Sequence, residues 1–266
     1  MSLRGRRVID ALKQRIGNYI TLPVPPFGNI KYWEKVYKQL SPDSVFEWGQ
    51  LKANDLAIHE SRLLQRGTQT LSGEPTQLIT LDSLLDISPH DTNTTTVILG
   101  CGNSAVGEEL VRTHGWKGNL LQIDYITKVV DEMTIKCKDL PNIDIILDDA
   151  IELSSLESRT IDAVFDKGLI DTIFCANEQD QITQIMNSVH RVLQPGGMFC
   201  LMSLSQPEYI MPSLDKVDLR LNKPLWSNIE ARECSKRAIM YRFKKAPDES
   251  SKLKLGGLKK GYKHPR

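Results

Sequence analysis

The sequence lacks several patterns that identify common classes of protein. Its five cysteines form no Cys-x-x-Cys pair and most lie in apolar runs, which indicates free thiols in a reducing compartment. No apolar run approaches the ~18–20 residues that a membrane span needs, and no secretory hydrophobic region is present. The five histidines have no metal-ligand spacing, and neither a Walker loop nor a nucleophile elbow occurs. We therefore expect a globular protein with no metal and no membrane partner.

An excess of one charge is also missing. The net charge of +1 gives no argument for binding to nucleic acid, and the basic clusters at residues 4–7 and 252–263 are typical of solvated tails. We expect three segments: a basic N-terminal extension (1–26), one domain (27–246) and a disordered basic tail (247–266). The basic start favours an amphipathic helix and a cytoplasmic protein, with an organelle transit peptide as the alternative.

The most informative feature that is present is a glycine turn followed by an acid. Residues 97–104 read Val-Ile-Leu-Gly-Cys-Gly-Asn-Ser, and an apolar strand then ends at Asp124. Gly100 and Gly102 let the backbone approach a ligand where a Cβ would block it. An acid at the end of the second strand can accept hydrogen bonds from ribose hydroxyls. The pair predicts a nucleoside-containing cofactor.

Around this pair, short apolar strands alternate with helical segments. A helix is expected over 104–114, begun by Asn103 or Ser104, and others over 127–138 and 179–193, with weaker helical patterns at 50–65 and 77–86. Two strand-like runs near the C-terminus have no helix between them and predict an antiparallel hairpin. The expected strands are 95–99, 120–123, 143–147, 161–165, 198–202, 228–233 and 238–243. The fold class is α/β: a seven-stranded, Rossmann-like sheet, mostly parallel, with a C-terminal antiparallel hairpin and helices on both faces.

A nicotinamide dinucleotide is the competing cofactor. Ala105 occupies the position of the third glycine in the Gly-x-Gly-x-x-Gly fingerprint of dinucleotide-binding proteins. Alanine can also satisfy that position, so this residue alone does not exclude a nicotinamide dinucleotide. The third strand also ends in acids, Asp148 and Asp149. A parallel sheet closed by an antiparallel hairpin resembles the class I methyltransferases, which use S-adenosylmethionine. That resemblance implies that Asp149 accepts the adenine amino group, with Asp148 as the alternative, and that the Ala150 N–H meets a ring nitrogen.

The resemblance becomes more specific over residues 27–203. In these segments the chain resembles the protein-lysine methyltransferases that act on translation elongation factor 1-alpha. The matching pieces are Phe27-Gly28, residues 32–37 (Tyr-Trp-Glu-Lys-Val-Tyr), Phe46-Glu47-Trp48, residues 99–104, Asp124-Tyr125, residues 166–171 (Asp-Lys-Gly-Leu-Ile-Asp) and residues 191–197 (Arg-Val-Leu-Gln-Pro-Gly-Gly). Gly49 departs from the family, which often has a second aromatic residue there.

The resemblance implies a site closed by aromatic side chains. Trp33, Tyr37 and Trp48 would cover the cofactor from the N-terminal side, Tyr125 would lie beside it, and Lys167 would contact it from the fourth strand. Aromatic faces attract cations, and the methyl donor is a sulfonium. The implied partner is a protein substrate, with elongation factor 1-alpha as the expected acceptor.

The catalytic residues are less defined. Asp166 and Asp171 should lie at the carboxyl edge of the sheet, where they could orient a target amine or cap a turn and the next helix. No catalytic base can be assigned from the sequence. Two other functions stay open: a methyltransferase acting on another protein or a small molecule, and a binding module that has kept the fold and lost turnover.

Overall fold

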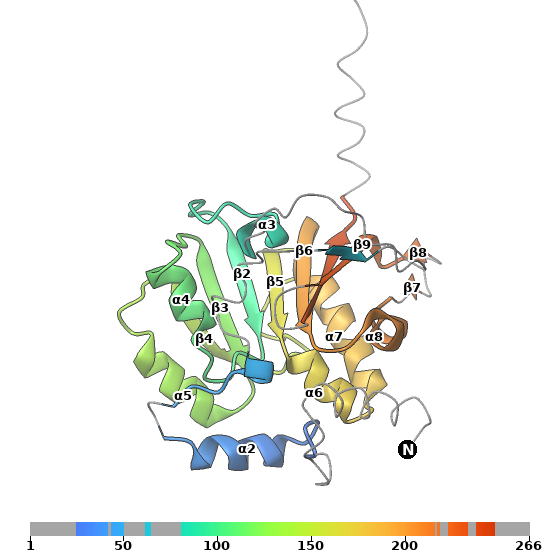
Figure 1. Cartoon of the computed structure of the whole chain (residues 1–266). Coiled ribbons are helices and arrows are strands. Elements are labelled where there is room, and N and C mark those ends of the chain that lie inside the picture. Colours follow the sequence, from blue (N-terminus) through green and yellow to red (C-terminus); the bar gives the residue numbers. More distant parts are fainter. Residues whose placement is uncertain are drawn as a thin grey trace, which may run out of the picture.

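The computed structural model describes residues 25–41, 44–50, 62–64, 81–215, 217–218, 223–233 and 238–247. The helix expected near the N-terminus, most of the helical pattern at 50–65 and nearly all of the two terminal segments lie outside these residues. The described chain is built on one large sheet with helices on both sides (Figure 1).

The sheet has the strand order β1-β9-β10-β6-β5-β2-β3-β4. Neighbouring strands from β6 to β4 are parallel, whereas β10, β9 and β1 are joined antiparallel at one edge. The bounds are β1 (Arg62–Leu64), β2 (Thr95–Leu99), β3 (Asn119–Asp124), β4 (Ile143–Leu147), β5 (Ile161–Lys167), β6 (Leu193–Ser203), β9 (Trp226–Glu233) and β10 (Ile239–Lys245). A separate ladder pairs β7 (Val217–Asp218) with β8 (Lys223–Pro224). The seven expected strands and the hairpin are confirmed, and β1 adds a short strand at the antiparallel edge.

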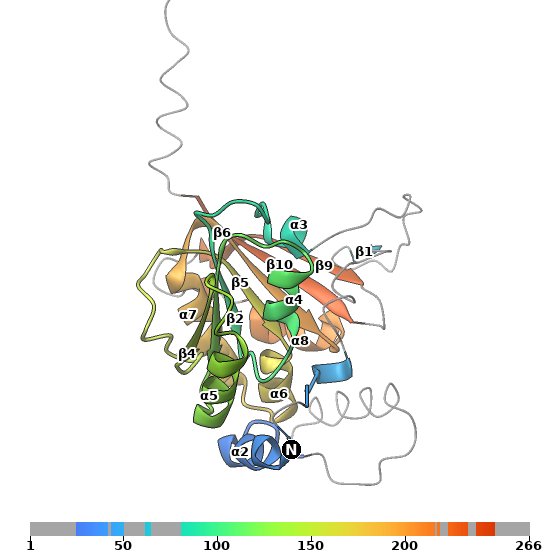
Figure 2. The ribbon, with the colours of Figure 1, turned by 90° about the vertical axis from the view of Figure 1, so that its left-hand side faces the viewer.

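The described helices cover both faces of the sheet and, in the case of α2, one end of it. They are α2 (Ile30–Gln39), α3 (Leu81–Leu85), α4 (Val106–Arg112), α5 (Thr127–Lys136), α6 (Leu169–Cys175), α7 (Gln179–Val192) and α8 (Pro207–Leu214), with a 3-10 turn, η1 (Trp48–Gln50). Figure 2 shows α4 and α7 on opposite sides of the sheet.

Alternation of apolar side chains along the central strands explains why helices cover both faces. On β6, Met198 and Cys200 belong to the core under α3, α4 and α5, whereas Phe199 and Leu201 belong to the core under α6, α7 and α8. Successive side chains of a strand point to opposite faces, so a continuous apolar run fills both cores. These buried strands hold the loops at their carboxyl ends in fixed positions.

Helix α2 lies across that end of the sheet (Figure 1). Asn29 caps it, because its side chain accepts a hydrogen bond from the Lys31 N–H at 2.9 Å. Trp33 and Tyr37 are its buried residues, and their four-residue spacing places both on the face turned toward the sheet. Helix α2 therefore covers the edge at which parallel sheets bind ligands.

The structure departs from the sequence-based expectations at several elements. Residues 62–64 form β1 rather than the end of a helix, because they pair with β9 at the sheet edge. Neither Asn103 nor Ser104 is the N-cap of α4, which begins after Ala105. Three helices, α2, α6 and α8, were not expected. In α6 five of seven residues are buried, so the helix has no one-sided apolar pattern by which it could be predicted. Helix α8 contains an internal proline, which argues against a helix in the sequence.

Candidate functional site

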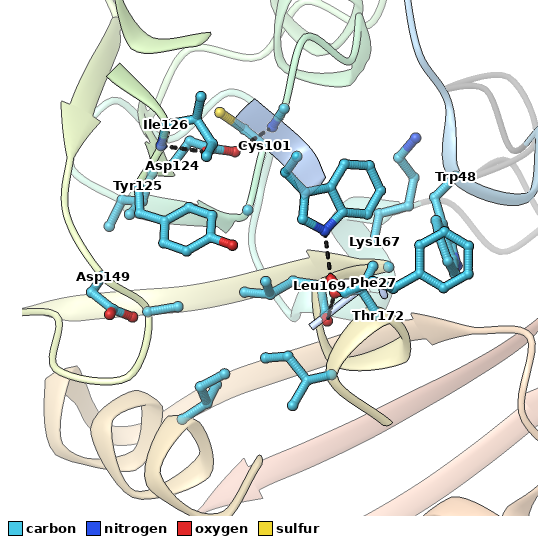
Figure 3. A pocket seen from close by; sticks show the side chains of 18 of the residues that line it. Phe27, Trp48, Cys101, Asp124, Tyr125, Ile126, Asp149, Lys167, Leu169 and Thr172 are labelled. Carbon is cyan, nitrogen blue, oxygen red and sulfur yellow. Dashed lines mark hydrogen bonds between the residues drawn. The ribbon is translucent and has the colours of Figure 1, made fainter. Parts of the chain in front are cut away.

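A cavity opens between the carboxyl ends of β2, β3, β4 and β5 on one side and residues 25–48 on the other (Figure 3). We call residues 25–41 and 44–48 the strap. The empty volume is about 970 Å³, including a part open to solvent, which suits a nucleoside-sized ligand. All residues predicted from the sequence to bind the cofactor line this cavity: Trp33, Tyr37, Trp48, Gly100, Gly102, Asp124, Tyr125, Asp148, Asp149, Ala150 and Lys167.

The glycine turn forms the floor of the cavity. Both Gly100 and Gly102 have φ of 53°, in the left-handed region that favours glycine. A Cβ on Gly100 would lie 2.9 Å from the Leu169 Cβ, and one on Gly102 would clash with the hydroxyl of Tyr37. The glycines therefore also let the strap and α6 approach the turn, a role that the sequence did not reveal.

Asp124 lies beside the turn at the end of β3. One carboxylate oxygen accepts from the Gly102 N–H at 2.9 Å, and the other accepts from the Ile126 N–H at 3.0 Å (Figure 3). The side chain is buried, and this burial raises the pKa of Asp124 despite the backbone donors. A carboxylate has about four acceptor positions, so two remain for ligand hydroxyls.

The two acids after β4 have different surroundings. Asp148 accepts hydrogen bonds from the Asp149 N–H, from the Ser154 hydroxyl and from both the N–H and the hydroxyl of Ser155. Asp149 is exposed and accepts from the Ile151 N–H at 2.8 Å. Asp148 thus holds the loop together, whereas Asp149 keeps acceptor capacity on the cavity side.

Tyr125 lies between these acids. Its side chain is half-buried, and Figure 3 places the ring in the cavity between Asp124 and Asp149. Burial, followed by the negative charges of Asp124 and Asp149, raises the pKa of Tyr125 to about 12. The neutral ring offers a flat apolar face together with a hydroxyl donor.

Aromatic side chains form the opposite wall, on the strap. Trp33 stacks near Phe27 with ring centroids 5.9 Å apart, and its indole N–H donates to the Phe27 carbonyl at 2.6 Å. Trp48 packs against Gly168, and its indole N–H donates to Asp171 at 3.1 Å. The wall combines apolar contact area with the electron-rich ring faces that attract cations.

Glu47 is a functional residue that sequence reasoning missed, although it lies within Phe46-Glu47-Trp48. Its carboxylate pairs with the Lys167 ammonium and accepts from the Ser104 hydroxyl at 2.9 and 3.1 Å and from the Ala105 N–H at 3.1 Å. These contacts of Glu47 connect the strap to the start of α4 and to the end of β5. No spacing rule could find it, because 57 to 120 positions separate the partners.

The two catalytic candidates have structural roles in the fold. Asp166 accepts from the Leu169 and Ile170 N–H groups at 2.8 and 3.0 Å and so caps the start of α6. Asp171 accepts from the Trp48 indole, the Ser203 hydroxyl and the Leu204 N–H. Both are buried, and neither lines the cavity. Of the two alternatives left by the sequence, the structure favours capping over orientation of an amine.

Five residues from α6 and α7, most of them apolar, complete the site. None was predicted to lie there, because α6 was not expected and the expected helix over 179–193 was not assigned to the site. The five are Leu169, Thr172 and Ile173 from α6 and Gln181 and Ile185 from α7. Together with Ile151 they give the cavity an apolar wall beside Asp149.

The described residues include neither a metal-ligand cluster nor a membrane-spanning helix. Among them, no group of three or more His, Cys, Asp or Glu side chains could hold a metal ion. No helix of the described chain is long and apolar enough to cross a membrane.

The donor set fits an adenosine-containing cation. A buried carboxylate faces one part of the cavity, an exposed carboxylate and apolar walls face another, and aromatic rings close the strap side. Ala150 follows Asp149, and among the described residues none accepts a hydrogen bond from its N–H. Fold and site thus define a Rossmann-like methyltransferase.

Comparison with known proteins identifies the family. A methyltransferase domain model matches residues 90–248, and the chain belongs to this family. Its cofactor is S-adenosylmethionine. The chain is 26% identical over 195 residues to the EEF1A lysine methyltransferase 4 of Mus musculus, covering 69% of this chain and 64% of that protein.

Two further matches have lower coverage or lower identity. The human eEF1A lysine and N-terminal methyltransferase is 26% identical over 186 residues, which cover 68% of this chain but 22% of that protein. The chain thus spans less than two thirds of the length of these relatives. A solved S-adenosylmethionine-dependent methyltransferase of Methanococcus maripaludis has a TM-score of 0.45 and 13% identity, covering 64% of this chain and 83% of that one.

Proposed function

We propose that this methyltransferase methylates a lysine side chain of a protein, with elongation factor 1-alpha as the acceptor. The observation that carries the proposal is the match over 69% of the chain to a protein named EEF1A lysine methyltransferase 4. The aromatic strap gives it physical support, because a lysine amine has to leave water before it can attack.

The cavity residues divide into two groups in this proposal. Asp124 accepts from the ribose hydroxyls with the oxygen positions that its backbone donors leave open. Asp149 accepts from the adenine amino group, and the Ala150 N–H donates to a ring nitrogen. Tyr125 lies against the nucleoside. Asp148 stabilises the loop after β4 instead of contacting the cofactor, because its carboxylate accepts hydrogen bonds from Ser154 and Ser155.

The strap forms the second group. S-adenosylmethionine supplies an activated methyl group whose transfer breaks a carbon–sulfur bond and forms a carbon–nitrogen bond. Trp33, Tyr37 and Trp48 keep water from that region, and their ring faces stabilise positive charge. A lysine amine has an unperturbed pKa near 10.4, and partial removal from water favours the neutral form that attacks.

Positioning is the main catalytic contribution in this account. The buried acids near the site, Asp166 and Asp171, are occupied by backbone, hydroxyl and indole donors and are not assigned as bases. The rigid strand ends and the strap would instead orient the lysine amine toward the methyl group of the bound donor. The proton leaves the product nitrogen to water.

The experiment is methyl transfer from labelled donor to purified elongation factor 1-alpha, followed by mass spectrometry of the labelled peptides. The proposal expects label on a lysine, lost when that lysine is replaced by arginine. Label in other proteins or in small molecules of a lysate, with none on this factor, would reject the acceptor. Donor binding without any transfer would indicate a binding module.

A further inference from the structure

Asp171 is a buried acid that connects the end of β6 to the aromatic wall of the cavity. Its side chain is 2% exposed, and one carboxylate oxygen accepts from the Trp48 indole at 3.1 Å and from the Leu204 N–H at 2.9 Å. The other oxygen accepts from the Ser203 hydroxyl. Asp171 itself does not line the cavity, whereas Trp48 does. The acid therefore lies one side chain behind the wall.

The Trp48 indole is held by three contacts of different kinds. Its five-membered ring lies over Gly168, where a Cβ would be 2.5 Å from the Trp48 Cγ and 2.6 Å from its Cδ1. The Phe27 ring meets it edge-on, with centroids 5.2 Å apart. The hydrogen bond to Asp171 is the most directional of the three, so it determines which way the plane of the indole is turned.

The order of the strands places Trp48 at one end of the cavity. In the proposed site, adenine lies beside Asp149 after β4 and ribose at Asp124, which ends β3. The sheet continues in the order β3-β2-β5, and Gly168, under Trp48, directly follows β5. Figure 3 shows Trp48 and Asp149 on opposite sides of the cavity. Trp48 thus belongs to the end away from adenine, which is the end left for the sulfur and its methyl group.

The sulfur at that end loses its positive charge when the methyl group is transferred. S-adenosylmethionine carries a sulfonium, which aromatic ring faces attract, whereas the thioether of S-adenosylhomocysteine is neutral. We infer that Asp171 is a positioning residue that favours the donor over the product by fixing the orientation of the Trp48 indole. The inference rests on the proposed placement of adenine and ribose in this cavity.

The test is isothermal titration calorimetry of both ligands on the full chain, and the quantity compared is the ratio of the donor Kd to the product Kd. Asp171→Ala releases the indole, and we expect the ratio to rise about fivefold. Asp171→Asn keeps an oxygen toward the indole and an amide that can donate to Ser203, so the ratio should stay within about twofold of the wild type. Trp48→Leu should raise the ratio by itself, and adding Asp171→Ala to it should have no further effect.

The indole N–H gives a second readout that needs no ligand. In two-dimensional NMR of the nitrogen-15-labelled protein, the signal lost in Trp48→Leu identifies this group. Asp171→Ala should shift the signal and speed its exchange with water, whereas Asp171→Asn should leave it protected. An unchanged signal in Asp171→Ala would show that the hydrogen bond does not hold the ring, and would overturn the inference.

Asp162→Ala is the matched control. Asp162 lies at the amino end of β5 and accepts from the Thr95 N–H at 2.8 Å and from the Gln194 amide, so its loss should lower stability and leave the ratio unchanged. If Asp171→Ala does not fold, Asp171→Ser replaces it, because a serine hydroxyl can still reach Ser203 but is too short for the indole.

Two results of the titration would contradict the inference. An unchanged ratio in a destabilised Asp171 variant would leave this acid with a purely structural role. A rise of equal size in the Trp48→Leu background would show that Asp171 does not act through the indole. Failure of the wild-type protein to bind either ligand would instead reject the cofactor assignment of the cavity, and the inference with it.

Discussion

The two sides of the cavity hold their residues by different means. On the strand-end side, Asp124 is held by backbone groups of its own loop and of the glycine turn, no more than 22 positions away. On the strap side, Glu47, Trp48 and Asn103 take part in hydrogen bonds and an ion pair between residues 57 to 123 positions apart. The strand ends are placed by the sheet itself, whereas the strap is placed by a few polar ties to it.

This difference separates two tasks. The strand-end side presents acceptors at positions that the parallel sheet fixes before any ligand binds. The strap supplies the aromatic wall and depends on Tyr37 over Gly102 and Trp48 over Gly168 to remain in place. Substitutions on the strand ends should act on ligand recognition, and substitutions at the ties should act on closure of the site.

The largest expected effect is that of Asp124→Ala. The change removes the proposed ribose acceptor and leaves two backbone N–H groups without their partner. We expect the affinity for S-adenosylmethionine to fall at least about a hundredfold, roughly 3 kcal/mol, by calorimetry. Asp144→Ala, an exposed acid on β4, is the control and should bind normally. Unchanged affinity in Asp124→Ala would reject the ribose assignment.

Asp166 should affect stability through pH. Burial raises its pKa from 3.8 to about 7, so the protonated carboxyl is favoured in the folded state. The stabilisation that results from this shift is fully present below the pKa that the Asp166 carboxyl has in the unfolded chain. It is lost as the pH rises through about 7, the pKa in the folded state. Between pH 5 and 8 the free energy of unfolding of the wild type should fall by about 2 kcal/mol more than that of Asp166→Asn. Parallel pH profiles of the two proteins in urea unfolding would contradict this.

Gly102→Ala tests the closure of the strap. The new methyl group would clash with the Tyr37 hydroxyl and also occupy a backbone with φ of 53°. Gly115→Ala is the matched control, because φ there is 69° and nothing lies within 4 Å of the new Cβ. Both changes should cost about 1 kcal/mol of stability through the backbone.

Only Gly102→Ala should also weaken donor binding, by about tenfold. Adding Tyr37→Phe removes the clashing hydroxyl and should recover part of that loss. Equal donor affinity of the two alanine variants would mean that contact between the strap and the turn does not matter for binding.

The smallest effect separates the neighbouring acids. Asp149→Asn replaces one acceptor of the proposed adenine site by a donor and should weaken donor binding about fivefold. Asp148→Asn removes the anion to which Ser154 and Ser155 donate, and should lower the melting temperature while binding changes less. The reverse pattern would assign adenine to Asp148.

The strand-end side could be predicted from the sequence because its rules are local. An apolar run, two glycines and an acid after the next strand determine the sheet edge, the turn and Asp124 within one repeat of strand and helix. Asp148 and Asp149 could not be separated, since their roles depend on which carboxylate Ser154 and Ser155 reach.

The role of the strap could be predicted only from the resemblance to a known family. No periodicity places Trp48 over Gly168 or brings Glu47 to Lys167, because those contacts exist only once the chain has folded back across the sheet. The burial of α6 hid that helix for a similar reason. The helix has no one-sided apolar pattern, so the sequence did not show that Asp166 and Asp171 flank or belong to a helix. A catalytic role and a role as acceptors within the fold therefore both stayed open for these two residues.

The central claim is that one cavity between strand ends and strap holds the methyl donor. A crystal structure with bound S-adenosylhomocysteine tests it most directly. The account predicts the ribose hydroxyls on the Asp124 carboxylate, the adenine beside Asp149 and the sulfur facing the aromatic strap. A ligand bound elsewhere on the chain, or bound in this cavity without contact to Asp124, would contradict the account.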